Sequence, residues 1–565
     1  MGLFSTLSIG TRGIFASQLG MDVAGQNISN ADVEGYSRKR ISTTADYRYD
    51  GSYGQMGFGV DVVNVVRKRD ALIDQQIQRQ NHFVGYFEEV DFSLEQIENI
   101  FTEPSDTGVL HFIDKFFDGW QNLANNPADL SARTMVKTNA EILNGVFHNL
   151  SSELRNLRQA ANDKITANMN RVNELAKEIY NINIEVGAVE IGNQNANDSR
   201  DKRDRLLKEL ASHIDYDTIE NEQGQITLTT NGQVLLSPVG YRSLETATTT
   251  FSRADGTSYT NIGLQFADSN VAYQPGNGTL RALFTVRDLV IPEQENNLDT
   301  LANSLVQEVN SLHTNGYNLY GYTGLEFFNS NTTGASDIAL SSSILESVQN
   351  IAAATGGQML NAAAVNVPAG VMNFGNLPTQ MSKTLGRQWI AGDPQAERAR
   401  NIVHGTVIVQ AGGATLAEGS DYFVNYVTGE IQMLHGGYDG QPVTVDFQYR
   451  TGAFKGPGDN ENAVDIAKLR EQLTMQPGPT GNSTNTFAQY YSSFIGRLGL
   501  ARNEAESNLE TREFLIKQFE EHQDSIAGVS LDEEMAEIIK YQHTFTAAAR
   551  LITTTSQMLE VLMNM

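Results

Sequence analysis

The sequence predicts a mainly α protein with β modules. Terminal coiled-coil helices and a long-helix bundle form a rod, and β-rich domains are inserted at the distal end. Three observations predict this fold: apolar heptad repeats at both chain ends, a long apolar stripe of helical period, and β-type stretches between helical segments. At 565 residues the chain is also too long for one core.

The two chain ends carry matching apolar repeats with a period of seven residues. Such a repeat makes one narrow seam along a helix, and a partner helix must cover that seam. Because the repeats lie at the chain ends, outside the main domain, we expect the ends to meet each other and to contact neighbouring subunits. The repeat residues are Leu7, Ile14, Met21 and Ile28 near the start, and Leu531, Met535, Ile538, Phe545, Ile552 and Leu559 near the end.

The first helix is predicted from about Leu3 to Ile28, and a valine-rich strand is predicted at 60–66. Helical periodicity then dominates from Ala71 to about residue 212. Its clearest part is an apolar stripe over 150–186, which corresponds to about 55 Å of helix. Burial within the protein's own core is the simplest interpretation of this stripe, and its length favours rod-like packing.

The period changes after residue 215. Alternation around Ile226 and Leu228 with Asn231-Gly232 predicts a β-hairpin. A helical stripe from Leu280 through Leu289 to Leu312 is expected to fold back onto the first long helices. Residues 402–450 predict at least four strands of a small sheet module, with a turn at Thr428-Gly429.

The chain becomes helical again from Phe487, and the last helix is expected to begin after Ser530. Ser530 is predicted to cap this helix while the Glu533 side chain returns the hydrogen bond. The expected division is a terminal domain (1–60 with 528–565), a long-helix rod (61–215 with 279–320 and 456–527), a β-rich domain (216–278) and an inserted domain (321–455) that contains the 402–450 module.

Composition excludes several functional classes. The net charge of −27 argues against binding to nucleic acid. The chain has no cysteine, and its nine histidines form no HExxH motif. GxSxG and P-loop motifs are absent too, so neither catalysis nor any cofactor or metal is expected. No run of 18 apolar residues occurs, so no membrane insertion is expected, and the start lacks the features of a secretory signal peptide.

Short motifs near the two ends are more specific. Asn27-Ile28-Ser29-Asn30 followed by Gly35-Tyr36-Ser37-Arg38 resembles the N-terminal signature of bacterial flagellar axial proteins, the family of rod, hook and hook-associated proteins. The stretch 528–535, with sequence GVSLDEEM, resembles a hook-associated member. Similar family motifs occur at 125–133, 201–206 and 458–463, so the resemblance covers about 1–330 and 456–565. Residues 32–34 depart from the usual Thr-Pro, and 357–455 match no family motif.

The resemblance implies a structural protein at the junction between the flagellar hook and the filament. It implies secretion through the flagellar type III channel and polymerisation through the terminal helices into a ring or helical assembly. The implied partners are further copies of the chain, hook protein, hook-associated protein 3, and an export chaperone on the C-terminal helix. It adds Asn27, Asn30, Gly35 and Tyr36 to the expected subunit interface.

Three alternatives remain open. The chain is another axial protein, either hook protein or flagellin-like; or it is an enzyme, for which the sequence offers no motif; or it is a surface adhesin that acts through the 402–450 module. The long helical stretch at 120–212 argues against hook protein, and the position of the Gly35-Tyr36-Ser37-Arg38 motif argues against flagellin. Glycan or host binding by the isolated module would reveal an adhesin.

Overall fold

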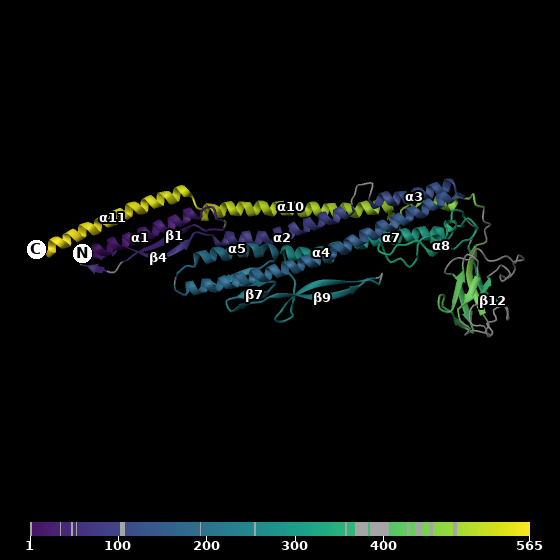
Figure 1. Cartoon of the computed structure of the whole chain (residues 1–565), viewed down its shortest axis with the longest axis horizontal. Helices are drawn as coiled ribbons and strands as arrows, with labels where there is room; N and C mark the ends of the chain where they lie inside the picture. The colour runs from purple at the N-terminus through teal and green to yellow at the C-terminus, as the bar shows by residue number, and fades with distance from the viewer. Residues whose placement is uncertain are drawn as a thin grey trace.

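The molecule is elongated, with both chain ends at one end and a β module at the other (Figure 1). We call these the proximal and distal ends. The structure is a computed structural model that describes residues 3–33, 35–46, 49–51, 54–101, 108–192, 194–253, 256–355, 359–367, 382–384, 406–425, 430–434, 443–450, 456–477 and 483–564. Long helices and small antiparallel sheets confirm the predicted mainly α fold with β modules. The predicted position of the β-rich domain at 216–278 is wrong, because its strands lie along the rod beside α4 (Leu130–Glu190) and not at the distal end.

The proximal end is a pair of terminal helices with a β arm. Helix α1 (Leu3–Ser29) packs against α11 (Leu531–Met563), which confirms the predicted first helix and the predicted start of the last one. Strand β1 (Lys39–Ala45) pairs antiparallel with β4 (Val60–Arg67), the predicted valine-rich strand, and both contact α1. Between them, β2 (Tyr49–Gly51) and β3 (Gly54–Met56) form a short hairpin.

The rod is built from long helices that lie side by side (Figure 1). Helix α4 is a single helix of 61 residues, about 90 Å long. Helix α10 runs along α2, and the segment from α6 to α7 returns onto α2 and α4, as the sequence predicts. The rod helices are α2 (Ala71–Phe101), α3 (Val109–Asn125), α4 (Leu130–Glu190), α5 (Asn197–His213), α6 (Gly278–Thr285), the π-helical segment η1 (Val286–Val290), α7 (Ile291–His313) and α10 (Phe487–Ala527).

Two apolar cores lie one after the other along the rod. The distal core includes Phe116, Trp120 and Phe327, and it is covered by α8 (Ser342–Glu346), η2 (Val348–Asn350) and α9 (Glu461–Lys468). The proximal core joins the second half of α4 to α5, α6 and the strands that lie between residues 226 and 273. The stripe at 150–186 runs through both cores and is buried along its length, as its periodicity predicts.

Two antiparallel sheets cover the proximal half of α4. One has the order β5-β6-β7-β8 and the other β11-β10-β9. Asn231 and Gly232 both have positive φ, 47° and 74°, which is the type I′ turn that their sequence predicts. The strands are β5 (Asp217–Glu220), β6 (Ile226–Thr230), β7 (Gln233–Ser237), β8 (Gly240–Tyr241), β9 (Leu244–Ser252), β10 (Ser258–Phe266) and β11 (Ala272–Tyr273).

Asparagine side chains of α4 attach these sheets to the helix. Asn183 Nδ2 donates to the Ile226 carbonyl (2.9 Å), and the Ile226 N–H donates to Asn183 Oδ1 (2.7 Å). Asn173 binds both backbone groups of Leu244 in the same way. Asn162 binds the carbonyl of one β10 residue and the N–H of another. The three positions are ten or eleven residues apart, about three helical turns, so they share one face of α4.

The β module at the distal end leaves and rejoins the rod at one place. The Thr355 N–H donates to Asp459 Oδ2 (2.8 Å), and the Ala463 N–H donates to the Ala353 carbonyl (3.1 Å). The module contains the sheets β12-β18-β14-β15 and β13-β17-β16, so the predicted four or more strands at 402–450 are confirmed. The predicted turn at Thr428-Gly429 lies outside the described residues.

Strand β12 lies in the Ala-, Gly- and Asn-rich stretch before the 402–450 module, for which no strand was predicted. The module strands are β12 (Met359–Val367), β13 (Ser382–Thr384), β14 (Ile408–Ala411), β15 (Ala414–Thr415), β16 (Tyr422–Asn425), β17 (Glu430–Met433) and β18 (Val443–Arg450). A separate hairpin of β19 (Met475–Pro477) and β20 (Ser483–Asn485) precedes α10.

Candidate assembly interface

Helices α1 and α11 run antiparallel and approach each other closely at glycines of α1. A Cβ atom on Gly10 would lie 2.6 Å from Ile552 Cγ1, and one on Gly20 would lie 2.6 Å from the Tyr541 ring. Side chains larger than hydrogen at these two positions would push the helices apart. These glycines were not among the predicted interface residues. Their heptad-like spacing with other small residues, Gly13, Ser17 and Ala24, is the signal that would have found them.

The predicted stripe residues lie on this pair of helices. Four of them on α11, Ile538, Phe545, Ile552 and Leu559, are half-buried, whereas Leu531 and Met535 are exposed. Between the half-buried positions lies a second row that the sequence analysis passed over, and it contains Glu534, Tyr541, Ala548 and Thr555. On α1, the predicted residues Leu7, Ile14, Met21 and Ile28 are all half-buried.

The helix pair also leaves large apolar side chains on its surface. Phe4 is 76% exposed and Ile539 is 53% exposed. Exposed apolar groups of this size, collected on one two-helix unit, are typical of a surface that another protein covers. The set consists of Phe4, Phe15, Leu531, Met535, Ile539, Leu551, Met558, Val561, Leu562 and Met563.

Asn27 lies buried where the helix pair meets the β arm. Its Nδ2 donates to the Lys39 carbonyl (2.9 Å) and to Glu534 Oε2 (2.9 Å). Its Oδ1 accepts from the Lys39 N–H (3.0 Å) and from the Tyr36 hydroxyl (2.9 Å). Both amide hydrogens and both acceptor positions are therefore used. An asparagine here joins α1, the following loop and α11 through one side chain.

Arg38 makes the second link to α11. Its Nε donates to Glu534 Oε1 and its Nη1 to Glu533 Oε2, both at 2.6 Å, and its N–H donates to the Ala527 carbonyl at 3.0 Å. Burial lowers the Arg38 pKa, but the hydrogen bonds and charges of Glu533 and Glu534 outweigh it, so that the pKa is raised. The guanidinium is thus a permanent charge at this joint.

The same contacts correct one prediction. Ser530 Oγ accepts from the Glu533 N–H at 3.5 Å, so the predicted cap is present. The Glu533 carboxylate does not return the bond, because it pairs with Arg38 instead. A complete capping box occurs at the start of α10, between Thr486 and Gln489, where the sequence analysis did not look for one.

Acidic residues of α5 hold the terminal unit, which consists of α1, α11, the β arm and the loop between α1 and β1. Asp201 accepts from the N–H (3.2 Å) and hydroxyl (2.8 Å) of Ser37 and from Arg67 (2.7 Å), while Asp204 also accepts from Arg67 (2.8 Å). Asp198 pairs with Lys39. Burial and then the charges of Asp198, Asp201 and Glu534 raise the pKa of Tyr36 to about 12, so its hydroxyl stays a donor.

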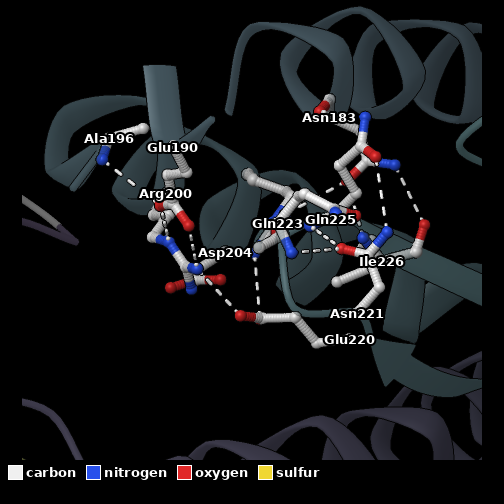
Figure 2. Close-up of polar contacts among 12 residues, drawn as sticks. Asn183, Glu190, Ala196, Arg200, Asp204, Glu220, Asn221, Gln223, Gln225 and Ile226 are labelled. Atoms are coloured by element: carbon white, nitrogen blue, oxygen red, sulfur yellow. Dashed lines mark hydrogen bonds and ion pairs between the residues drawn. The ribbon is translucent and has the colours of Figure 1, made fainter. Parts of the chain in front are cut away.

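Helix α5 is also fixed to the rest of the rod (Figure 2). Arg200 donates to Glu190 Oε1 (2.6 Å) and to Glu220 Oε1 (2.8 Å). Arg203 is buried, and it donates to the Gly224 carbonyl (2.7 Å) and to Asn183 Oδ1 (3.2 Å). The motif at 201–206 therefore works as a connector, with acidic residues toward the terminal unit and Arg203 toward the rod.

Gly35 and Asn30 have different surroundings. Gly35 has φ of +77°, and a Cβ there would lie 2.6 Å from the Arg205 side chain, so both conformation and space require glycine. Asn30 Nδ2 donates to the Gln26 carbonyl (2.8 Å), a local bond at the end of α1. The structure thus brings Asn27, Gly35 and Tyr36 to the joint, whereas Asn30 terminates a helix.

Motifs from three distant parts of the sequence therefore meet at one buried joint. The model of the family "Flagellar hook-associated protein FlgK helical domain" matches residues 94–328, and that of "Flagellar basal body rod FlgEFG protein C-terminal" matches 524–565. Flagellar hook-associated protein 1 of Bacillus subtilis is 24% identical over 99% of this chain and 98% of its own length. The corresponding protein of Salmonella typhimurium is 25% identical over 98% of both chains.

The chain carries the helical domain of the flagellar hook-associated protein FlgK and is similar over nearly its whole length to flagellar hook-associated protein 1. It is a structural protein of the bacterial flagellum and not an enzyme, as these similarities establish. A solved structure, "The structure of the flagellar hook junction protein FlgK from Burkholderia pseudomallei", has the same fold, with a TM-score of 0.55 and 18% identity. The match covers 80% of this chain and 100% of that one.

Among the residues that the structure describes, no helix has the length and apolarity needed to cross a membrane. Within the same ranges, no group of three or more histidine, aspartate and glutamate side chains is arranged to hold a metal ion.

Proposed function

We propose that this chain forms part of the junction between the flagellar hook and the filament, and that it polymerises there through α1 and α11. The names of its relatives, hook-associated protein 1 and hook junction protein, support this position. The observation that carries the proposal is the paired helix unit itself, which lies outside the two rod cores and exposes a large apolar set.

The energetic argument favours copies of the same unit as the cover. Burying one large apolar side chain contributes about 1.5–3 kcal/mol, so helix pairs that cover each other's exposed apolar side chains in a ring are far more stable than one pair alone. An isolated pair of helices that meet along a narrow seam is only marginally stable in water. The buried joint of Asn27, Arg38 and Glu534 holds the pair at a defined angle to the rod, so every copy presents the same surface.

The remaining partners follow from this position. Hook protein binds on one side of the ring and hook-associated protein 3 on the other. The chain reaches the site through the flagellar type III channel, unfolded and without disulfides, which suits a sequence that has no cysteine. Before export, a chaperone covers the apolar face of α11, including the exposed Met558 and Leu562.

Deletion of the gene in its host tests the proposal. Hooks without filaments, and flagellin lost to the culture medium, are the expected result because the filament then lacks its base. Normal filaments would refute the junction role. They would direct attention to glycan or host binding by the 402–450 module.

A point variant tests the polymerising surface. Ile539→Asp changes a side chain that is 53% exposed, so the folded monomer is retained while the buried assembly contact is lost. We expect the variant to fail to restore filaments to the deletion strain, although circular dichroism matches the wild type. The control is Ser507→Asp on the exposed side of α10, which should restore filaments. Full restoration by Ile539→Asp would contradict polymerisation through this surface.

A further inference from the structure

The rod changes from one apolar core to the other at a single level. On α4, the distal core ends at Leu154 with Leu157 packed against it, and the proximal core begins at Ile165. On the α6–α7 segment, the change falls between Leu283 and Val286. Close packing makes each core resist deformation, so any bending concentrates where the two cores meet.

That level is filled by polar side chains. Arg158, Asn162 and Arg287 lie there, each at most 4% exposed. Arg287 Nη1 donates to Asn162 Oδ1 (2.9 Å), and Asn162 binds the β10 backbone. Nearby, Lys164 pairs with Glu89 at 2.7 Å. We call this level the waist.

The helix path is irregular at the waist. The π-helical turn η1 (Val286–Val290) joins α6 to α7 there, and π-turns are recognised points of helix kinking. A cavity of about 570 Å³ adjoins it, lined in part by Asp288, Pro292 and Glu295. The waist therefore combines an irregular helix with space into which side chains can move.

The β9–β10 hairpin bridges the waist. Its base belongs to the proximal core through Leu244 and Phe266. Its tip reaches α7 in the distal half, where Arg253 Nη2 donates to Glu295 Oε1 (2.6 Å). The Tyr259 ring lies against two guanidinium groups, 4.3 Å from Arg158 and 5.0 Å from Arg253. Figure 1 shows β9 lying along the rod beside α4.

Glu295 is the centre of this contact. Its second oxygen accepts from Arg158 Nη2 at 2.5 Å, so one carboxylate holds an arginine of α4 and an arginine of the hairpin. Each arginine donates from one nitrogen to a different carboxylate oxygen, and charge-assisted bonds of this kind are roughly twice as strong as neutral ones. Bending the rod at the waist would change the distance between the hairpin base and α7, and the contact would have to open.

We propose that the waist is a hinge of the rod and that the β9–β10 hairpin is a brace that limits its bending through Arg158, Glu295 and Arg253. The brace keeps the distal half of the rod aligned with the proximal half. Loss of the tip contact frees the hinge without unfolding either core.

Spin-label distances across the waist test the proposal. The chain has no cysteine, so Lys177→Cys and Gln307→Cys give a clean labelled pair at two exposed sites, one on each side. With both helices straight, the labels are on the order of 50 Å apart. Pulsed electron paramagnetic resonance is expected to give a narrow distance distribution in the parent and a broader one, with a shifted mean, in Arg253→Ala. Arg253→Lys keeps the charge and should remain close to the parent.

Arg242→Ala is the matched control. Arg242 also pairs with an acid, Asp268 (2.7 Å), and stacks on an aromatic ring, Phe266 (3.9 Å), but it lies on the proximal sheets away from the waist. An unchanged distribution in Arg253→Ala, with the fold intact by circular dichroism, would refute the brace. Equal broadening in Arg242→Ala would refute it as well, since the effect would then not be specific to the waist.

Discussion

At the scale of single residues, His313 shows how burial fixes a protonation state. It is fully buried; its Nε2 accepts from the Ala352 N–H (2.9 Å), which leaves Nδ1 protonated and donating to the Leu325 carbonyl (2.6 Å). If Nε2 were also protonated, its N–H would point at the Ala352 N–H and the hydrogen bond would be lost. Burial, reinforced by the charge of Arg133 and opposed by the Leu325 bond, lowers the His313 pKa to about 4.

This predicts that the distal core loses stability in mild acid. The unfolded histidine titrates near 6.5 and the folded one near 4, so the unfolded state binds more protons below pH 6.5. Stability is therefore unaffected above pH 7 and falls as the pH drops from about 6.5 toward 4, by roughly 2 kcal/mol at pH 5. Urea unfolding at pH 7 and pH 5, followed by Trp120 fluorescence in a Trp389→Phe background, measures the loss because Trp120 contacts His313.

The variant His313→Gln removes the titrating group. It should lower stability at pH 7 and reduce the loss of stability between pH 7 and pH 5, while the part that comes from His82, whose pKa burial also lowers to about 4, remains. His543→Gln, at an exposed position of α11, should leave that dependence as it is. An undiminished pH dependence in His313→Gln would assign the acid sensitivity to groups other than His313.

Asn27 gives a second prediction at the residue scale. In Asn27→Asp, the donor to the Lys39 carbonyl is lost and a carboxylate faces Glu534. Unpaired buried groups cost about 1–3 kcal/mol, and like charges add to this. We expect faster amide hydrogen exchange in the first turns of α11, with exchange in α4 unchanged.

Two comparison variants sharpen that experiment. Adding Glu534→Gln to Asn27→Asp restores a donor opposite the new carboxylate, so it should slow the exchange again. Asn30→Asp alters only a local bond at the end of α1 and should have little effect. If Asn30→Asp is as disruptive as Asn27→Asp, the joint does not depend on the Asn27 contacts.

At the scale of elements, the asparagines of α4 determine how the proximal sheets attach. Asn183→Ala leaves the N–H and carbonyl of Ile226 without their partner and removes one acceptor of Arg203. We expect a loss of about 2–4 kcal/mol in the stability of the proximal core, since each unsatisfied buried group costs about 1–3 kcal/mol. Asn181→Ala, at an exposed position two residues earlier, is the control. Equal stability of the two variants by urea unfolding would show that apolar packing alone attaches the sheets.

Helix geometry explains one error of the element predictions. The stripe from Leu280 to Leu312 was expected to bury Leu289, yet that side chain is 63% exposed. At about 100° per residue, Leu289 falls on the opposite side of the helix from Leu280 and Leu298, so it does not belong to the apolar stripe. Leu283 and Leu298 are buried as expected.

At the scale of the whole molecule, regular periods were the most predictable features. The ends of α1 and α11 and the stripe of α4 were correct because each depends on a local repeat. The Asn231-Gly232 hairpin was correct because two positive φ values favour those residues. The Ala- and Asn-rich strand β12 has no such signal, and its pairing with β18, about 80 residues away, decides its structure.

The joint was only partly predictable. The family motifs identified Asn27, Gly35 and Tyr36, but nothing local to Glu533 indicates a partner 495 residues earlier in the chain. A capping bond was therefore the natural expectation, and a long-range ion pair replaced it. The close approach of Gly10 and Gly20 to α11 depends in the same way on a second helix that the local sequence does not contain.

The single crossing point between the rod and the β module has a practical consequence. A hydrogen bond within the rod holds Thr355 next to Asp459. The two attachment points of any segment inserted between them are therefore already close together. The entropy of closing such a loop grows only slowly with its length. We therefore expect the distal end of the rod to accept a foreign domain with adjacent termini in place of the β module, far from α1 and α11.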